Sequence, residues 1–208
     1  MRLLAAADIH GSQYRLNIIL HNIEEYQPDL VVICGDITQF GPGETATNFL
    51  NQIPVETLAL PGNIDSADVG EAIQKSKATN IDLQRVVKYN FSFVGIGGVP
   101  PSFSRLTITD GRLKKPLEKI IDSHTVLVTH IPPYKLQDRV FIGSHAGSKE
   151  LRHLVDTYEP RLVLCAHIHE DPGVTVSGKT TVVNCSLGKR TEGTLITINE
   201  TVKVTILE

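Results

Sequence analysis

The feature that most constrains this chain is a short apolar run that ends at a glycine and a carboxylate. Residues 31–34 read Val-Val-Ile-Cys, and Gly35 and Asp36 follow directly. A run of this length and composition is typical of a strand that is buried on both faces of a parallel sheet. An aspartate at the end of such a strand has lost much of its water, so it needs a hydrogen-bonded partner or a cation. We expect Asp36 to bridge two metal ions.

Four further apolar runs end in residues that can bind a metal ion. The run at residues 3–7 leads to Asp8 and His10, that at 55–60 to Asn63, that at 125–129 to His130, and that at 162–166 to His167 and His169. Ligands of open α/β sheets bind at the carboxyl ends of the strands, so such endings can build one site from distant segments. The pattern therefore predicts a metal centre at one edge of a sheet.

Each ending has a simpler explanation when it is taken alone. Asn63 follows a glycine and would usually be a turn residue, and His130 would usually be a hydrogen-bonded histidine at a strand end. His167 and His169 are a stronger signal, because alternate residues of an extended chain point the same way. Turn chemistry does not explain why every ending carries metal-binding side chains, so the joint pattern favours a metal centre.

Length, charge and cysteine content limit the class of protein. A chain of 208 residues fits a single domain, residues 1–208, with a sizeable core. A net charge of −3 offers no basic surface for a long nucleic acid. The run at residues 3–7 is too short for the core of a signal peptide, and we expect no membrane span. The three cysteines lie in or beside apolar runs, which predicts buried thiols in a reducing compartment and hence a cytoplasmic protein.

Hydrophobic periodicity predicts alternating strands and helices over most of the chain. Helices are expected after Ser12, around residues 46–53, around residues 69–73, over residues 113–121 and after Ser148. Two strands are expected across a tight turn, at residues 84–88 and 90–96. The segment 97–103 is expected to be a connector or a loop over the site, and the long loop 131–147 is of a kind that is often functional.

The last 35 or so residues change character, because hairpins replace the alternation of strands and helices. Residues 174–176 and 180–183 flank a Ser-Gly pair, and residues 195–198 and 202–207 flank an Asn-Glu pair. These two hairpins predict an antiparallel meander at the end of the chain. Together with the preceding alternation, they predict an α/β fold in which two sheets pack together with helices outside.

The ordered set Asp8-x-His10, Gly35-Asp36, Gly62-Asn63, His130 and His167-x-His169 resembles the motifs of the calcineurin-like metallophosphoesterases. The motifs span residues 8–169, which is most of the chain. The resemblance implies a four-layer α-β-β-α sandwich of two mixed sheets flanked by helices. It also implies two divalent metal ions (Mn, Fe, Zn, Co or Ni), one held by Asp8, His10, Asp36 and His169 and the other by Asp36, Asn63, His130 and His167.

The chain departs from the family pattern at three positions. Ile64 stands where the family commonly has a histidine that orients the phosphate or protonates the leaving group. Small prokaryotic phosphodiesterases of the family often have another residue there, and this chain looks more like that subgroup. Gln39 replaces the family's second aspartate, and Ala166 replaces the glycine before the His-x-His pair, a small change.

The resemblance implies hydrolysis of a small phosphoester or nucleotide-type substrate, with a phosphodiester more strongly indicated than a monoester. We expect in-line attack of a metal-held hydroxide without a covalent enzyme intermediate, with Asp36, Asn63 and His130 in the catalytic centre. Because position 64 lacks a histidine, His145 is the candidate general acid, and the alternative is an ordinary exposed loop histidine. Asp65 is expected either to orient a ligand histidine or to cap a helix.

A different class of function fits the same residues. Some members of the resembled family are better known as binding platforms, so the alternative is a metal-binding, non-catalytic interaction scaffold of the same fold. Metal-dependent turnover, with manganese as the first cation to test, distinguishes the two readings. The sequence leaves open which metal is bound and whether the chain forms a homo-oligomer.

Overall fold

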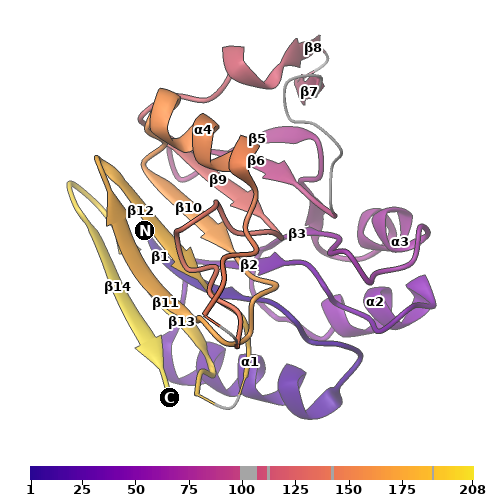
Figure 1. Cartoon of the computed structure of the whole chain (residues 1–208). Coiled ribbons are helices and arrows are strands. Elements are labelled where there is room, and N and C mark those ends of the chain that lie inside the picture. The colour runs from indigo at the N-terminus through magenta and orange to yellow at the C-terminus, as the bar shows by residue number, and fades with distance from the viewer. Residues whose placement is uncertain (99–106, 112, 142, 189) are drawn as a thin grey trace.

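The computed structural model describes residues 1–98, 107–111, 113–141, 143–188 and 190–208. Two mixed β-sheets pack face to face, and helices cover their outer faces (Figure 1). This confirms the predicted four-layer sandwich. Within the described residues, no helix combines the length and the apolar character needed to cross a membrane.

The first sheet places the ends of three parallel strands at one edge. Within the described residues its order is β14-β13-β1-β2-β3-β4. The strands are β1 (Arg2–Ala6), β2 (Leu30–Cys34), β3 (Thr57–Leu60), β4 (Thr79–Asn80), β13 (Gly193–Ile198) and β14 (Val202–Leu207). Strands β1 to β4 run parallel, β13 pairs antiparallel with β1, and β14 pairs antiparallel with β13.

The second sheet supplies two more parallel strand ends. Its order in the described part of the chain is β11-β12-β10-β9-β6-β5-β7-β8. The strands are β5 (Gln84–Lys88), β6 (Phe91–Ile96), β7 (Thr107–Asp110), β8 (Leu113–Pro116), β9 (Thr125–Thr129), β10 (Leu162–Cys165), β11 (Gly173–Ser177) and β12 (Thr180–Asn184). Strands β6, β9, β10 and β12 are parallel.

Alternation along the buried strands builds the layers. In β1, Leu4 packs with the helices on the outer face, whereas Leu3 packs between the sheets with residues such as Phe93. The helices α1 (Gln13–Tyr26), α2 (Gly43–Leu50) and α3 (Val69–Lys75) cover the first sheet, and α4 (Lys149–Tyr158) and the 3₁₀ helix η2 (Leu117–Lys119) cover the second. Ser12 and Ser148 cap α1 and α4, as predicted.

The predicted helix over residues 113–121 is wrong. Residues 113–116 form β8, which pairs with β7, and only the 3₁₀ turn η2 follows. Proline lacks an N–H and clashes with the preceding turn, so Pro116 prevents a helix through this segment. The apolar spacing reflects instead that Leu117, Ile120 and Ile121 are buried against the second sheet.

The predicted C-terminal meander is also wrong, although both of its hairpins form. The β11–β12 hairpin joins the second sheet through β12 and β10, whereas the β13–β14 hairpin joins the first sheet through β13 and β1. Turn residues specify local pairing, but the sheet edge that a hairpin joins depends on distant strands.

Smaller differences concern helix ends and loops. Helix α2 ends at Leu50, and Ile53 is buried beyond it. Helix α3 begins at Val69 with Asp68 before it, so the predicted cap at Asp65 is wrong. Of the predicted loop at 97–103, residues 99–103 lie outside the described residues.

Candidate metal centre

The structure brings the predicted metal-binding residues to one edge of the sandwich. Each follows a parallel strand: Asp8 and His10 follow β1, Asp36 follows β2, Asn63 follows β3, His130 follows β9, and His167 and His169 follow β10. Two groups of side chains have ligand atoms within 4.8 Å of one another, Asp8 with His10 and His169, and Asp8 with Asp36 and His130. Five distant segments therefore meet as the strand ends predict.

We call Asp8, His10 and His169 the open half of the centre, because both histidines are partly exposed. The Nε2 atoms of His10 and His169 lie 3.4 Å apart, and their rings are stacked. The same atoms lie 3.9 Å and 3.4 Å from Oδ1 of Asp8. Two imidazole nitrogens and a carboxylate thus converge on one point.

We call Asp36, Asn63, His130 and His167 the closed half, because Asp36 and His130 are buried, although Asn63 is exposed and His167 is half-buried. Nδ1 of His130 lies 2.9 Å from the carbonyl oxygen of Cys34, to which it donates, and Nε2 lies 2.8 Å from Oδ1 of Asn63 and 3.3 Å from Oδ2 of Asp36. The ring of His167 meets the ring of His130 edge-on. Metal-binding histidines commonly donate their other N–H to a carbonyl or carboxylate, which orients the ring, and His130 follows this pattern.

The buried carboxylate of Asp8 provides the test of whether a cation fits. Among the described residues, neither of its oxygens has a hydrogen-bond partner, although Asp8 is fully buried. Burial by itself raises the pKa of Asp8, but the contact with His169 and the charge of His130 outweigh it, so the pKa is lowered. Its two oxygens still lack a hydrogen bond, and a divalent cation among these ligands would satisfy them.

The histidines respond to the buried carboxylates. Burial lowers the pKa of His130, but contact with Asp36 more than compensates, and the pKa is raised. Contact with Asp8 likewise raises the pKa of His169. To bond both Asn63 and Asp36, Nε2 of His130 has to carry a proton, which occupies the place where a cation would bind. Burial lowers the pKa of His10 and of His167, so protons compete with metal ions mainly at His130 and His169.

The backbone at the centre is strained. Asp8, His10, Asp36 and His167 have φ angles of 60°, 53°, 50° and 71°, in the left-handed region. For residues with a Cβ this conformation costs about 1–2 kcal/mol each. The loops are held in place because Asp8 N–H donates to the carbonyl of Gly35 and His10 N–H to that of Asp36. Such strain concentrates at functional sites.

The two glycines before Asp36 and Asn63 are required by close packing. A Cβ on Gly62 would lie 2.0 Å from Oδ1 of Asp36, and a Cβ on Gly35 would lie 2.7 Å from Nδ1 of His130. Gly35 also has a φ of +94°, which favours glycine. The Gly-Asp and Gly-Asn pairs therefore allow the second and third strand ends to touch.

Asp65 joins the two loops of the closed half. Its carboxylate accepts hydrogen bonds from the N–H groups of Ile37, Thr38 and Gly62 at 2.7–3.1 Å. It therefore ties the segment after Asp36 to the segment before Asn63. Of its two predicted roles, the helix cap is wrong. The orientation of a ligand histidine stays a prediction, since the described residues show no hydrogen bond from Asp65 to one.

His145 lies in the long loop after β9 and is held there by other residues of that loop. Its Nδ1 contacts the buried carboxylate of Asp138, and its ring meets that of Tyr134 edge-on. Asp138 also accepts from the N–H groups of Lys135 and Gly147. The structure gives His145 no contact with the described metal-binding residues, and its role as general acid stays a prediction.

The sequence analysis did not identify two groups that contact the proposed metal-binding residues. Arg15, in the first turn of α1, donates to the carbonyl oxygen of Asp8, and the carbonyl of Cys34 orients His130. Asp8 rather than Asp36 belongs to both groups of converging ligand atoms, so the bridging role of Asp36 stays a prediction. Main-chain partners leave no signal in the sequence, because every residue carries the same carbonyl group.

Comparison with known proteins identifies the family of this chain. The family model for calcineurin-like phosphoesterases matches residues 1–171. Uncharacterized protein MJ1162 of Methanocaldococcus jannaschii is 32% identical over 89% of this chain and 88% of that protein. The chain belongs to the calcineurin-like phosphoesterase family.

The chain is also similar to a second relative and to a solved structure. The probable glycerophosphodiester phosphodiesterase GpdQ of Arcobacter nitrofigilis is 27% identical over 78% of this chain and 64% of that protein, so this chain matches less than two thirds of it. The crystal structure of TT1561 of Thermus thermophilus has the same fold, with a TM-score of 0.70 over 100% of this chain and 99% of that one, at 16% identity. Family and relatives indicate a phosphoesterase, and Asp8, His10, Asp36, His130 and His169 form its candidate metal site.

Proposed function

We propose that this phosphoesterase is a phosphodiesterase whose centre holds two divalent cations. One observation carries the proposal: the buried carboxylate of Asp8 has no hydrogen-bond partner among the described residues, yet imidazole nitrogens converge on it. In this proposal one cation is held by Asp8, His10, Asp36 and His169, and the other by Asp36, Asn63, His130 and His167.

The chain's own residues provide a rigid frame for direct, in-line hydrolysis. When bound, the two cations would lower the pKa of water and stabilise the attacking and leaving oxygens of the phosphoryl group. The bond to Cys34 directs Nε2 of His130 into the centre, and Asn63 offers a neutral amide oxygen. This mixture of nitrogen and oxygen ligands suits Mn, Fe, Zn, Co or Ni, with availability deciding among them.

Position 64 supports a preference for activated diesters. The backbone N–H of Ile64 donates to Asp36, but its aliphatic side chain has no proton to give to a leaving group. General acid catalysis typically contributes about 10²–10⁴-fold, so without it good leaving groups are favoured. The similarity to a probable glycerophosphodiester phosphodiesterase supports a small phosphodiester, including nucleotide-type diesters, as the substrate class.

Metal analysis coupled to a phosphoester panel tests the proposal. We expect about two equivalents of manganese to bind, with hydrolysis of bis(4-nitrophenyl) phosphate that is abolished by chelation. An alkyl phosphate monoester should be hydrolysed far more slowly. The control is His153→Gln, which removes an exposed histidine of α4 and should bind metal like the wild type. Comparable turnover of the alkyl monoester and the aryl diester would contradict the diester preference.

A scaffold is the second candidate, and the aliphatic side chain at position 64 favours it. The same panel separates the two functions. Tight metal binding without turnover of any phosphoester would support a scaffold, whereas metal-dependent turnover that is lost in Asp36→Asn supports the enzyme.

A further inference from the structure

Asn184 is the last residue of β12, the strand beside β10 in the second sheet, and it is fully buried. Nδ2 of Asn184 donates to the carbonyl oxygens of Ile168 at 2.8 Å and of Gln137 at 3.2 Å. Oδ1 accepts from the backbone N–H of Ser186 at 3.1 Å and from its hydroxyl at 2.8 Å. A side-chain amide has two N–H donors and an oxygen with two lone pairs, so Asn184 makes all four of the hydrogen bonds open to it.

The bond to Ile168 holds the peptide group between the two histidines of the His-x-His pair. Because a peptide group is planar, fixing the carbonyl of Ile168 also sets the direction in which the chain enters His169. The backbone is strained at this point, since His167 has a φ of 71°, and the N–H of Ile168 donates to the carbonyl of Ala166 in a tight turn. Asn184 therefore supports the segment that carries one ligand of each proposed cation.

The other two partners of Asn184 belong to two further segments of the centre. Ser186 forms a parallel bridge with Ala7, the residue before Asp8. Gln137 lies in the long loop after β9. Asn184 is therefore buried where three segments that carry or adjoin metal-binding residues meet.

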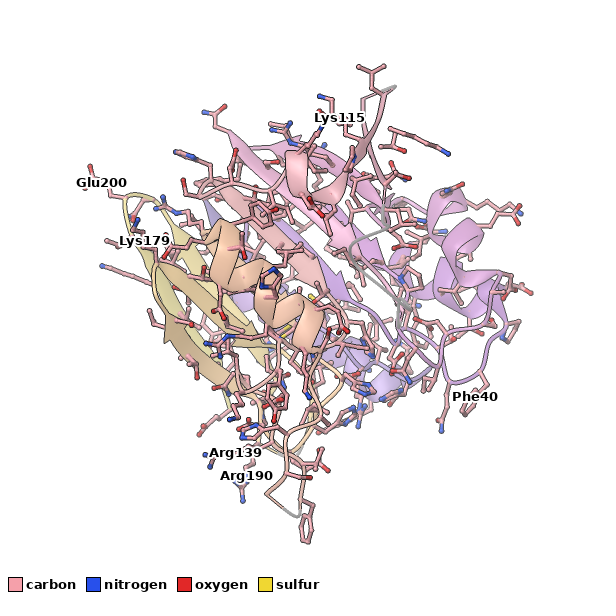
Figure 2. The ribbon with its side chains drawn as sticks, turned by 45° about the horizontal axis from the view of Figure 1, so that its top comes forward. Phe40, Lys115, Arg139, Lys179, Arg190 and Glu200 are labelled. Carbon is pink, nitrogen blue, oxygen red and sulfur yellow. The ribbon has the colours of Figure 1, made fainter. Side chains whose placement is uncertain are left out.

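The long loop after β9 is joined to the chain just after His169. The N–H of Arg139 donates to the carboxylate of Asp171 at 2.9 Å, and Nε2 of Gln137 donates to the carbonyl of Asp171 at 3.0 Å. The side chain of Arg139 itself projects toward solvent (Figure 2). Together with the bond from Asn184 to the carbonyl of Gln137, these contacts hold the loop and the His-x-His segment against each other.

We propose that Asn184 is a positioning residue of the metal centre, which directs His167 and His169 toward their cations through the carbonyl of Ile168. The inference rests on the proposed metal-binding role of these two histidines. Asn184 does not touch a cation in this proposal, and it acts through the backbone. Loss of a hydrogen-bond partner that orients metal ligands typically lowers metal affinity about 10–100-fold.

Asn80 offers a matched control for the loss of a buried amide. It is the last residue of β4, it is 9% exposed, and its Nδ2 donates to the carbonyl of Gly70 in α3 at 2.8 Å. Its Oδ1 accepts from the N–H of Asp82, two residues on, as Oδ1 of Asn184 accepts from Ser186. These bonds of Asn80 reach no proposed metal ligand. Asn80→Ala and Asn184→Ala should therefore both lower the free energy of unfolding, and only Asn184→Ala should alter the metal centre.

Titration with Co²⁺ separates positioning from stability, because the visible spectrum of bound Co²⁺ depends on the geometry of its ligands. We expect Asn184→Ala to bind Co²⁺ about 10–100-fold more weakly than the wild type and with a changed spectrum. Asn80→Ala should keep the affinity and the spectrum of the wild type. Asn184→Ser, which keeps one hydroxyl donor, should lose about threefold to tenfold in affinity, part of that loss. Urea unfolding of the metal-free proteins measures the stability of each variant.

The inference is overturned if Asn184→Ala keeps the affinity and spectrum of the wild type, or if Asn184→Ser does so where Asn184→Ala does not fold. It is also overturned if Asn80→Ala, at an equal loss of stability, weakens Co²⁺ binding as much. A wild type that binds no Co²⁺ would contradict the metal centre and the inference with it. Asn184-dependent binding in a protein that hydrolyses no phosphoester would support the positioning role and contradict only the proposed reaction.

Discussion

The open and closed halves of the metal centre differ in how their polar groups are satisfied. In the closed half, His130 and Asp36 are held by Cys34, Asn63 and the N–H of Ile64. In the open half, both oxygens of Asp8 and Nδ1 of His10 have no hydrogen-bond partner among the described residues. The closed half is therefore organised by the protein itself, whereas the open half is completed by what it binds.

This difference has an energetic consequence. A hydrogen-bonded group contributes to stability whether or not a ligand is present, whereas a buried carboxylate without hydrogen bonds contributes little until a cation binds it. Substitutions in the closed half should therefore weaken both folding and function. Substitutions that remove charge from the open half should weaken function alone.

The largest effect is expected from Asp36→Asn. Asp36 contacts His130, and its charge also acts on His10 and His167, so its loss weakens metal binding in both halves. Losing several kcal/mol of charge stabilisation corresponds to a fall in turnover of about 10³-fold or more. Steady-state hydrolysis of an aryl diester with manganese measures it. Asp29→Asn, an exposed residue at the other end of β2, is the control, and near-normal turnover in Asp36→Asn would remove Asp36 from the centre.

Asp65→Asn should reduce turnover about 10–100-fold, as expected for a residue that orients metal ligands without touching the metal. The amide keeps only one acceptor oxygen and turns a donor toward backbone N–H groups that the carboxylate now binds. Metal titration should show weaker binding as well. Asp68→Asn removes a nearby carboxylate that bonds Gly43 and Ser66, and it should leave metal affinity unchanged. Equal losses in both variants would refute the special role of Asp65.

Gly62→Ala should lower the free energy of unfolding by about 1–3 kcal/mol, the usual penalty for forcing extra atoms into a packed site. The added Cβ would meet Oδ1 of Asp36 at 2.0 Å, so metal affinity should fall too. Gly70→Ala is the matched control, because Gly70 lies in α3 and its Cβ would meet nothing closer than 3.9 Å. That variant should be more stable by up to about 1 kcal/mol, because alanine favours helices. Urea unfolding measures both.

The smallest effects are expected on the free energy of unfolding, from one substitution in each half of the metal centre. With a chelator present, Asp8→Asn should change the free energy of unfolding by less than about 1 kcal/mol, because the carboxylate has no hydrogen bond to lose and the attraction of His169 and His130 offsets the cost of its burial. Asn63→Ala should lower it by about 0.5–1.5 kcal/mol, because it breaks the bond to His130. Manganese should stabilise both variants less than the wild type. Destabilisation by Asp8→Asn under chelation would show that the open half is satisfied without a cation.

Much of the architecture follows from the sequence, because burial and turn chemistry are local properties. The apolar runs at residues 31–34 and 162–166 are buried strands, and serines 12 and 148 cap helices where the spacing predicts. The segment at residues 113–121 misled the prediction, because Leu117, Ile120 and Ile121 are buried by a turn rather than by a helix.

The sequence by itself determined which residues end the buried strands, since a strand's apolar run and the metal-binding residues after it are adjacent in the chain. Only the tertiary structure decided which groups those residues meet. It placed the carbonyl of Cys34 against His130, Arg15 against Asp8, and the carboxylate of Asp65 between two loops. It also sent the two C-terminal hairpins to different sheets. The physical reason is that periodicity records whether a side chain is buried, whereas its partner is set by contacts between segments far apart in the chain.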